Sequence, residues 1–553
     1  MKLRTATRGP LWTVFEALGD LMRLLLALSG PIGVGKSEFC RILSKRFGAL
    51  RLSTRELLVA RGAPEVREDL QAAGERLDRE TEGRWVADAL VARLSEENSE
   101  IIIVDAIRIK KQIDHIRRSF GDKVRVWHVF LDAEDAILAD RYEKREKKIS
   151  EFATYAQVKA SATEATIRSL KAVADRAIDT SRCEAVSAVA QAVAGLGLYP
   201  HAPERLVDVV VGGQYGSEGK GHVCAYLARD YGLLVRVGGP NAGHKVKHPE
   251  NTYIQLPSGT MSNKNANILI GAGATISLET ILEEIAKLGL GPDRLKIDRR
   301  AVIIEPSDLA YEERSMDAIG STKKGVGVAT ARKILGRDGN EHLDAKVRLA
   351  ASIPELQPFL ACGDELLERA YARGTRICLE GTQGTDLSLH HAQYPNVTSR
   401  ETTASGCLAD AGIAPGRVRR VVMVTRTYPI RVGGTSGDMG RPIDAQTIAN
   451  RSGLPVEQIE RTEVGTVSGK KRRIAEFDWE QVRRAAALNG ATDIALSFSD
   501  YIHQSNQLAR RYEQLTTETR DFIESVERVT NAPVSLISTR FEIRGIIDRR
   551  DWR

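Results

Sequence analysis

Two glycine-rich stretches, each with one lysine, have the composition of loops that bind phosphate groups. The first is Gly30-Pro-Ile-Gly-Val-Gly-Lys-Ser37, a full GxxxxGK(S/T) match, and the second is Gly212-Gly-Gln-Tyr-Gly-Ser-Glu-Gly-Lys-Gly221. Small residues let backbone N–H groups approach a phosphate, and the N-terminus of a following helix adds positive potential. Lys36 would reach the β- and γ-phosphates and Ser37 would ligate Mg²⁺. Lys220 stands where a P-loop lysine would, although the spacing differs. The glycines expected to line the two sites are Gly30, Gly33, Gly35, Gly216, Gly219 and Gly221.

Each loop lies between a strand-like run and a helix-like run. Leu24–Leu28 and Val209–Val211 are short apolar runs typical of buried strands. After the first loop, apolar residues recur with helical spacing from Phe39 to Phe47. A chance match to a glycine turn is the alternative, but the order strand, loop, helix favours a P-loop.

Four further residues could serve the first loop. The apolar run Ile101–Val104 predicts a buried strand ending at Asp105, which could hold Mg²⁺ or its water, and Arg108 could bind an acceptor phosphate. Arg141 and Arg145 are four residues apart on a predicted helix, where a kinase lid would carry them; a solvated charge run is the alternative. The region resembles small-metabolite and nucleotide kinases, and no motif names the acceptor.

Five motifs follow the second loop in a fixed order. They are Gly-Gly-Pro-Asn-Ala-Gly-His (238–244), Gly-Ser-Thr-Lys-Lys-Gly-Val-Gly (320–327), Glu-Gly-Thr-Gln-Gly-Thr (380–385), Tyr-Pro-Asn-Val-Thr-Ser (394–399) and Val-Arg-Arg-Ala (482–485). In this order they resemble adenylosuccinate synthetase over roughly residues 207–551. The resemblance is closest to the compact archaeal and phage branch, which includes phage synthetases that act on dGMP.

The resemblance implies a ligase that replaces a purine 6-oxo group with the amine of L-aspartate. Such enzymes first phosphorylate O6 with a nucleoside triphosphate, because oxide is a poor leaving group. Lys220 would belong to the phosphate cradle, and the carbonyl of Gly243 would help to hold Mg²⁺. His244 would donate to O6 or to the transferring phosphoryl group; a buried, hydrogen-bonded histidine is the alternative.

The resemblance also assigns substrate-binding residues. Arg337 would cross a homodimer to the partner's substrate phosphate, with Arg332 as a rival for that role. The basic run at 468–473 would bind the carboxylates of aspartate, although such runs are more often solvated faces. The purine nucleoside monophosphate would be held by Asn241, Thr322, Gln383 and Thr398, and aspartate by Ser468, Lys470 and Arg472; Gln383 is also counted as catalytic.

Three positions depart from the family pattern. Ser217 stands at the family's catalytic, metal-ligating aspartate, and a serine leaves room beside N1 and C2 for the 2-amino group of guanine. Phe498 replaces a lysine near Asp500 in the segment that reads the phosphoryl donor, so ATP becomes plausible beside GTP. Pro240 has no physical explanation. We therefore expect (d)GMP ahead of IMP as acceptor. The alternatives are an ordinary IMP-using synthetase and an impaired, nucleotide-sensing protein; a regulatory NTPase is the alternative to a kinase for the first region.

Composition limits the remaining classes of function. The chain has 553 residues, a net charge of +7 and 5% aromatic residues. The surplus of positive charge suits the binding of anionic nucleotides, but it is too small and too dispersed to predict nucleic-acid binding. The six cysteines have no paired spacing, which indicates a reducing, cytoplasmic setting. The run Leu24–Leu28 is too short to cross a membrane, and no membrane association is expected.

The predicted architecture is α/β, with two P-loop-type domains whose mostly parallel sheets are flanked by helices. We expect an N-terminal extension at 1–22, a P-loop nucleotide-kinase-like domain at 23–196, a linker at 197–206 and a synthetase-like domain at 207–553. Residues 150–196 are predicted to be helical.

Overall fold

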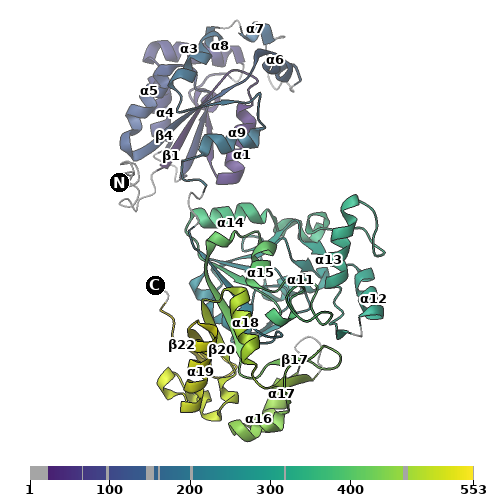
Figure 1. Ribbon diagram of the computed structural model, residues 1–553. Coiled ribbons are helices and arrows are strands. Elements are labelled where there is room, and N and C mark those ends of the chain that lie inside the picture. The colour runs from purple at the N-terminus through teal and green to yellow at the C-terminus, as the bar shows by residue number, and fades with distance from the viewer. Residues whose placement is uncertain are drawn as a thin grey trace, which may run out of the picture. The chain divides into compact units, whose positions relative to one another are not determined.

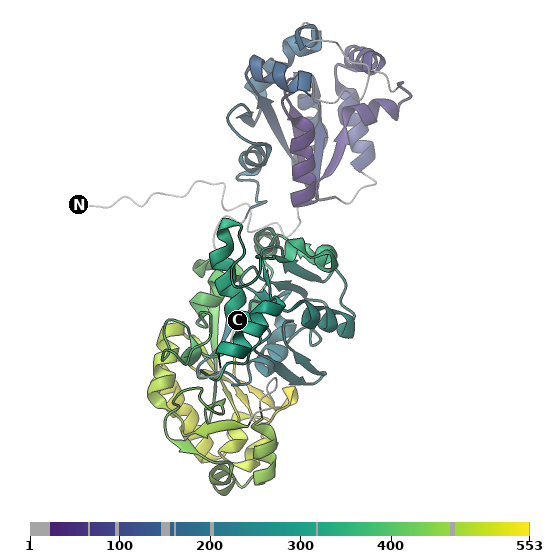
Figure 2. The same ribbon diagram turned by 90° about the vertical axis from the view of Figure 1, so that its right-hand side faces the viewer.

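The computed structural model describes residues 23–64, 67–94, 99–144, 155–159, 162–199, 204–316, 319–464 and 471–551. The predicted extension at 1–22 and the candidate residues Arg145, Ser468 and Lys470 lie outside them. Contacts divide the chain into two compact units, Met1–Tyr199 and Pro200–Arg553, here called the N-terminal and C-terminal units. Both are α/β, as predicted, with helices on the two faces of a mostly parallel sheet (Figure 1, Figure 2).

The N-terminal unit contains a parallel sheet with the strand order β2-β3-β1-β4-β5. Alternate side chains of the central strand enter two cores: Leu24 and Leu26 pack with α1 and α9, and Leu25 packs with α4 and α5. Burial on both faces explains the unbroken apolar run at 24–28. The elements are β1 (Arg23–Ser29), α1 (Lys36–Phe47), β2 (Leu50–Ser53), α2 (Thr54–Val59), α3 (Arg67–Thr81), α4 (Arg84–Leu94), β3 (Ile101–Asp105), α5 (Lys110–Phe120), β4 (Val124–Asp132), α6 (Asp135–Lys144), α7 (Tyr155–Lys159), α8 (Ala162–Ile167), β5 (Arg176–Asp179) and α9 (Ala185–Val193).

The prediction that 150–196 is helical throughout was wrong in part. β5 lies within that range and pairs in parallel with β4, Ile178 opposite Leu131. Only Ile178 of this four-residue edge strand is buried. A single buried residue produces no apolar run, so the surrounding alanine-rich helical pattern hid the strand.

The C-terminal unit contains a larger sheet with the order β14-β12-β10-β7-β15-β6-β16-β20-β21-β22. All pairs are parallel except β21 with β22. The central strand β6 alternates in the same way: Val209 and Val211 face α15, α18 and α19, and Val210 faces α10. The strands are β6 (Val207–Gly212), β7 (Leu233–Arg236), β10 (Asn267–Ile270), β12 (Leu295–Asp298), β14 (Leu360–Ala361), β15 (Ile377–Glu380), β16 (Val418–Arg426), β20 (Asp493–Ser497), β21 (Val534–Ser538) and β22 (Ile546–Asp548).

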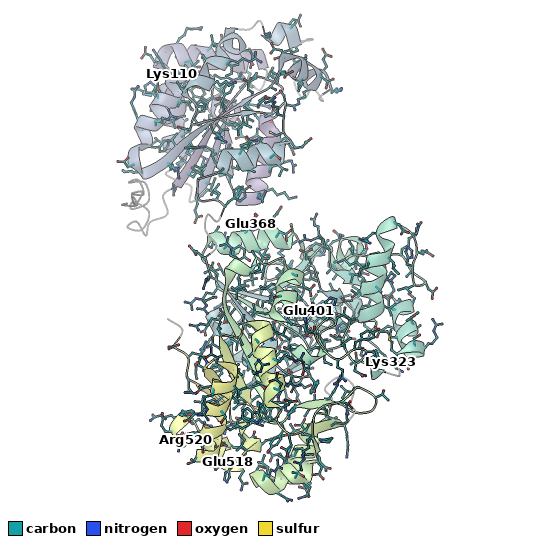
Figure 3. All side chains as sticks on the ribbon, in the orientation of Figure 1. Lys110, Lys323, Glu368, Glu401, Glu518 and Arg520 are labelled. Atoms are coloured by element: carbon teal, nitrogen blue, oxygen red, sulfur yellow. The ribbon has the colours of Figure 1, made fainter. Side chains whose placement is uncertain are left out.

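Helices cover both faces of this sheet, and those at the surface bury one face and expose the other. In α19, for example, Glu518 is exposed (Figure 3). Ile523 and Val526 of the same helix are buried. The helices are α10 (Lys220–Leu227), α11 (Leu278–Leu288), α12 (Pro306–Ser315), α13 (Val326–Leu335), α14 (Gly363–Ala372), α15 (Ala404–Ala411), α16 (Ala445–Ser452), α17 (Val456–Thr462), α18 (Trp479–Asn489) and α19 (Thr517–Thr530).

Smaller sheets complete the unit. Strands β17 (Ile430–Val432), β19 (Arg472–Ala475) and β18 (Pro442–Ile443) form an antiparallel layer that packs with α16 and α17 around Ile448 and Ile459. This layer carries Arg472. The hairpin β8 (His244–Lys247) with β9 (Glu250–Tyr253) and the pair β11 (Thr275–Ile276) with β13 (Val302–Ile303) are the other two.

Candidate active sites

The second phosphate loop joins the carboxyl end of β6 to the N-terminus of α10. Gly216 and Gly219 have φ of 89° and 93°, and Gly219 is the left-handed N-cap of α10. Ser217 between them also has a positive φ, 59°, which strains a residue with a Cβ. The chain therefore turns sharply at the edge where ligands bind in open parallel sheets.

Lys220, the first residue of α10, is 2% exposed and ion-paired inside the loop. Its Nζ lies 2.5 Å from Oε2 of Glu218. The other oxygen of Glu218 accepts N–H groups from Gln214 (3.1 Å) and Gly216 (2.7 Å). Because a buried lysine is costly without a partner, Glu218 holds the ammonium in place and fixes the loop around it.

Close glycine contacts bring the motif at 238–244 to this loop. A Cβ on Gly221 would lie 2.5 Å from Cβ of His244, and one on Gly238 would lie 2.2 Å from Cγ2 of Thr382. A Cβ on Gly212 would lie 2.7 Å from both Nζ of Lys220 and the carbonyl of Gln383. Lys220, His244 and Gln383, which the sequence separates by up to 163 positions, are therefore neighbours.

The same kind of contact brings in the motifs at 320–327 and 394–399. A Cβ on Gly239 would lie 2.8 Å from Val326 at the start of α13, and one on Gly327 would lie 3.2 Å from Ser399. The loop that carries Thr322 and the loop that carries Thr398 thus meet at α13.

His244 is buried in a charged cluster that the sequence analysis did not identify. Its Nδ1 contacts Glu380 and lies 3.2 Å from Oγ of Ser258, and Arg236 binds the same carboxylate at 2.8 Å. Burial, with Arg236 nearby, lowers the pKa of His244 to about 4. Burial alone would raise the pKa of Glu380, but Arg236 and His244 outweigh it and the pKa falls to about 2.

This cluster sets the tautomer of His244. An ionised Glu380 accepts the Nδ1 proton, so Nε2 of the neutral ring is an acceptor. Donation to a substrate oxygen then requires a proton on Nε2, and Glu380 would stabilise the imidazolium as negative charge develops. Glu380 is the first residue of the motif at 380–385, and this position could have identified it as a site residue. Arg236 is the last residue of a strand, and no feature of the sequence indicates its role.

Two predicted ligand-binding side chains have buried atoms without a hydrogen-bond partner among the described residues. These atoms are Nε2 of Gln383 and Oδ1 of Asn241. The other end of the Gln383 amide is held by Oγ1 of Thr382 at 2.8 Å, and Gln383 has φ of 57°. Since buried polar groups are normally paired, an amide fixed at one end and unpaired at the other suits a polar ligand.

Arg426 connects the antiparallel layer that carries Arg472 with the second phosphate loop. Arg472 lies 3.7 Å from Glu463, and Arg426 lies 2.5 Å from the same carboxylate. The ring of Phe498 covers Arg426, with 3.9 Å between the guanidinium and the ring centre. Phe498 was noticed as a departure, but its contact with the buried Arg426 was missed because nothing in their spacing links them.

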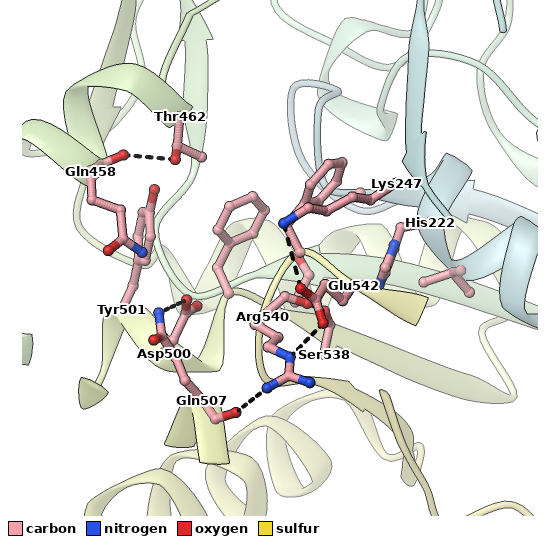
Figure 4. Close-up of a pocket in the computed structure, with 15 residues that line it drawn as sticks. His222, Lys247, Gln458, Thr462, Asp500, Tyr501, Gln507, Ser538, Arg540 and Glu542 are labelled. Carbon is pink, nitrogen blue, oxygen red and sulfur yellow. Dashed lines mark hydrogen bonds and ion pairs between the residues drawn. The ribbon is translucent and has the colours of Figure 1, made fainter. Parts of the chain in front are cut away.

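A pocket of about 370 Å³ lies at the carboxyl ends of β20 and β21 (Figure 4). Asp500 is buried there; its Oδ2 accepts from Nε2 of Gln507 at 3.1 Å, and its Oδ1 has no partner within the described chain. Burial raises the pKa of Asp500 to about 6. The ring of Phe541 stacks on His222 at 5.4 Å. The pocket is lined by Gly219, His222, Val223, Lys247, Gln458, Thr462, Ser497, Phe498, Asp500, Tyr501, Gln507, Ser538, Arg540, Phe541 and Glu542.

Arg337 and its rival Arg332 differ sharply in exposure. Arg332 is fully buried, with an ion pair of 2.5 Å to Asp308 and a hydrogen bond to the carbonyl of Ile303. It fixes α13 within its own unit and cannot reach a second chain. Arg332 is therefore excluded as the residue that would bind the substrate phosphate of a partner. Arg337 is exposed just after α13, and its Nε donates to the carbonyl of Ile334 at 2.8 Å.

The first phosphate loop leads from β1 into α1, whose N-cap Gly35 is left-handed. A Cβ on Gly30 would lie 2.2 Å from the carbonyl of Leu131, so only glycine fits there. Nζ of Lys36 donates to the carbonyls of Gly30 (2.6 Å) and Pro31 (2.9 Å). Burial, with Arg108 nearby, lowers the pKa of Lys36 to about 8.

Two other candidates of the N-terminal unit, Asp105 and Arg141, are engaged by a second residue. Arg51 of β2 donates to Asp105 at the end of β3 (2.9 Å). Arg141 of α6 donates to the hydroxyl and the carbonyl of Thr180, at 3.0 and 2.9 Å. Arg141 therefore binds the loop after β5, and its role in a lid stays a prediction. Ser37 is exposed at the first turn of α1.

Metal clusters and membrane-spanning helices are both absent from the part of the chain that the structure describes. No group of three or more His, Cys, Asp or Glu side chains is arranged to hold a metal ion. None of the described helices is long and apolar enough to span a membrane.

Comparison with known families gives a match to the C-terminal unit and one to the N-terminal unit. The family model described as adenylosuccinate synthetase matches residues 209–346 and 338–509. The chain belongs to the adenylosuccinate synthetase family. A model described as an AAA domain matches residues 26–160, which include the first phosphate loop. The resemblance inferred from the motifs is confirmed.

Individual relatives agree with this assignment. The adenylosuccinate synthetase of Pyrococcus sp. (strain ST700) is 37% identical over 353 residues, which cover 62% of this chain and 98% of the relative. The succinoaminodeoxyadenylate synthetase of cyanophage S-2L, solved with dGMP and with dATP as an energy donor, is 27% identical. It covers 63% of this chain and 96% of its own, with a TM-score of 0.53. Adenylosuccinate synthetase of Plasmodium falciparum shares the fold at 18% identity, with a TM-score of 0.54, covering 62% of this chain and 100% of its own.

Within the adenylosuccinate synthetase family the C-terminal unit is a purine-nucleotide ligase. Its phosphate loop, His244 and Gln383 lie together, as the family's chemistry needs. The individual roles of the site residues remain predictions.

Proposed function

We propose that the C-terminal unit joins L-aspartate to C6 of a guanine nucleoside monophosphate, with (d)GMP preferred to IMP. The observation that carries this proposal is Ser217, which stands where the family pattern has a carboxylate. Lys220, His244 and Gln383 lie around the same loop. A small, uncharged residue leaves space for the 2-amino group of guanine. The cyanophage relative solved with dGMP supports this choice.

In the first step O6 attacks the γ-phosphorus of the triphosphate, the bond to the β-phosphate oxygen breaks, and N1 loses its proton. Loop amides and Lys220 bind the phosphates, and His244 donates to the oxygen on which charge develops. Mg²⁺ would neutralise phosphate charge, held in part by the Gly243 carbonyl and the Ser217 hydroxyl. A serine hydroxyl is a poor base at neutral pH, so the N1 proton must pass to water or to the triphosphate. In the second step the amine of aspartate displaces phosphate at C6.

ATP is the favoured phosphoryl donor, and GTP is the alternative. Phe498 stands where the family pattern has a lysine and packs on Arg426. Asp500 keeps an unpaired oxygen in the pocket. A carboxylate can accept from N6 of adenine as well as from N1 and N2 of guanine, so Asp500 does not by itself exclude either base. The dATP donor of the cyanophage relative favours adenine.

The proposal is tested by incubating the protein with aspartate, Mg²⁺, ATP or GTP, and each of IMP, GMP and dGMP. The succinylamino product of the guanine nucleotides should form with a kcat/KM above that for IMP. A product from IMP alone would make the protein an ordinary adenylosuccinate synthetase. Binding of all three nucleotides without any product would favour a nucleotide sensor.

For the N-terminal unit we propose an ATP-dependent nucleotide kinase at 23–196, separated from the synthetase unit at 207–553 by the linker 197–206. The matched P-loop and the basic residue Arg108 beside it support phosphoryl transfer. Transfer of ³²P from ATP to purine nucleoside monophosphates, with Lys36→Ala as control, tests it. ATP hydrolysis without transfer to any of them would favour a regulatory NTPase.

We also propose that the C-terminal unit forms a homodimer in which Arg337 reaches the partner's substrate phosphate. Two large apolar side chains at the end of α13, just before Arg337, are exposed: Ile334 is 56% exposed and Leu335 51%. Exposed apolar groups that cluster beside a basic residue suit a protein interface. The mixing experiment in the Discussion tests the shared site.

A further inference from the structure

The first phosphate loop carries a carboxylate from another part of the N-terminal unit. Glu164 of α8 accepts the backbone N–H of Ile32, inside the loop, at 3.1 Å. Its other oxygen accepts from Arg108 at 2.7 Å, and the side chain is 7% exposed. The contact spans 132 positions of the sequence.

Two groups donate to this carboxylate, the Ile32 amide and the Arg108 guanidinium, and the Lys36 ammonium is close enough to be affected by its charge. Glu164 raises the pKa of Lys36, which opposes the lowering by burial and by Arg108. Meanwhile Lys36 donates to carbonyls of its own loop, Gly30 and Pro31. The motif instead assigns Lys36 to the β- and γ-phosphates.

A carboxylate and a phosphoryl group are interchangeable in such a setting. Both are anionic, both present oxygens about 2.2–2.5 Å apart, and both accept from backbone amides and from arginine. The oxygens of Glu164 therefore stand in for oxygens of the terminal phosphoryl group of a nucleoside triphosphate. Arg108, which binds the same carboxylate, must then face that phosphoryl group rather than the far end of an acceptor.

We propose that Ile32, Lys36 and Arg108 form the site for the terminal phosphoryl group of a nucleoside triphosphate, and that Glu164 is an internal competitor for it. This rests on the proposed kinase or NTPase function of the N-terminal unit. Binding of the triphosphate displaces Glu164 and releases α8 from the loop. A nucleoside diphosphate lacks the competing group and leaves Glu164 where it is.

The test uses the full chain, with hydrogen–deuterium exchange read on peptides that cover the first loop and α8. Wild type is titrated with AMP-PNP and, separately, with ADP. AMP-PNP should protect the loop and increase exchange in α8, and ADP should protect the loop only. Glu164→Gln keeps the shape and removes the charge, so the AMP-PNP concentration for half-protection should fall about five- to tenfold. The ADP value should change less than about twofold.

Arg108→Ala distinguishes two possible roles of this arginine, binding the terminal phosphoryl group of the triphosphate and binding the phosphate of an acceptor. If it faces the transferred group, the preference of the loop for AMP-PNP over ADP falls about fivefold or more. The matched control is Glu100→Gln, an exposed carboxylate just before β3, at the opposite edge of the sheet; it should change neither titration.

The outcomes separate this inference from the function on which it rests. Loss of all loop protection in Lys36→Ala establishes the nucleotide site. If neither nucleotide protects the loop of wild type, the proposed function of the N-terminal unit is wrong. If both protect it, while Glu164→Gln and Arg108→Ala leave both titrations as in wild type, the function stands and the assignment of Glu164 and Arg108 is overturned.

Discussion

Ser217 is the residue on which the proposed choice of purine rests. Its positive φ of 59° fixes its direction, and its backbone carbonyl lies 3.5 Å from Arg426. A hydroxyl there can accept one hydrogen bond and donate another. An aspartate would add charge and bulk beside the edge where guanine carries its 2-amino group.

We predict that Ser217→Asp shifts acceptor preference toward IMP. One hydrogen bond or clash is worth about 1–3 kcal/mol, or roughly ten- to a hundredfold in selectivity. The measurement is the ratio of kcat/KM for dGMP and IMP in wild type and variant. Ser217→Ala is the control, because it removes the hydroxyl without adding bulk and should keep the guanine preference. If wild type already prefers IMP and Ser217→Asp only runs faster, the guanine assignment fails.

We predict that Asp500 makes the choice between ATP and GTP as phosphoryl donor depend on pH. Its pKa is raised by burial to about 6, so its neutral form is favoured below that pH and its ionised form above it. The neutral acid can donate to N1 of adenine, whereas the carboxylate can only accept, which suits N1–H of guanine. The ratio of kcat/KM for ATP over GTP should therefore fall about three- to tenfold from pH 5.5 to 7.5. Asp500→Asn cannot titrate, and its ratio should be flat; the same slope in this variant would assign the effect to another group.

At this scale the sequence identified residues that belong to ordered motifs and missed those that support them. His244 and Gln383 were predicted because each lies in a recognisable motif. Arg236 was missed, since an arginine at a strand end has no special spacing. Its function comes from the contact with Glu380, 144 positions away, which only the folded chain creates.

At the scale of elements, the site depends on glycines that let loops cross. Gly384 lies against the first turn of the second phosphate loop. A Cβ there would be 2.2 Å from the carbonyl oxygen of Gln214 and 2.5 Å from the amide of Gly216. Its own φ of −132° is one that alanine adopts freely. Only the crossing, and not the backbone angle, requires glycine at this place.

We therefore predict that Gly384→Ala destabilises the C-terminal unit by about 1–3 kcal/mol, as overpacking does. Ligase activity should fall more than about tenfold, because the loop must shift. Gly291→Ala is the matched control, since no atom lies within 4 Å of its added Cβ; it should change stability by less than about 0.5 kcal/mol. Thermal unfolding and ligase assays provide the measurements. If Gly384→Ala and Gly291→Ala had equal effects, the close contact between Gly384 and the second phosphate loop would not be what requires glycine at position 384.

Elements with buried apolar runs were predictable, and short edge elements were not. β1 and β6 could be placed because both faces are covered. β5 could not, because its stability comes from hydrogen bonds to β4 and from one buried side chain. The contact of Glu164 with the first loop was missed for a similar reason: an alanine-rich segment with one acidic residue has no pattern that indicates its partner.

At the scale of the whole molecule, the two phosphate loops lie in separate cores. We predict that Lys36→Ala reduces phosphoryl transfer or hydrolysis by the N-terminal unit at least about a hundredfold, and changes ligation by less than about twofold. Lys220→Ala should do the opposite. Both activities are followed on the same preparation. Loss of ligation in Lys36→Ala at saturating substrates would mean that the two units are coupled.

A shared site between two copies predicts rescue by mixing. Arg337→Ala and Lys220→Ala should each be inactive as ligases. A mixed dimer contains one site with neither change, so up to about a quarter of wild-type activity is expected after subunit exchange. The control mixes each variant with itself. Demonstrated exchange without recovery would contradict a shared site.

The order of strands in the larger sheet has a consequence for the newly made chain. β6 carries the phosphate loop, but its two neighbours begin only at Ile377 and Val418. At roughly 5–20 residues per second, β6 leaves the ribosome on the order of ten to forty seconds before β16 does. The N-terminal unit, whose sheet is complete by Asp179, can fold during synthesis in the meantime. Both edges of this apolar strand stay open until β15 emerges, and one stays open until β16 does, so expression of this protein should benefit from slower initiation, lower temperature or added chaperones.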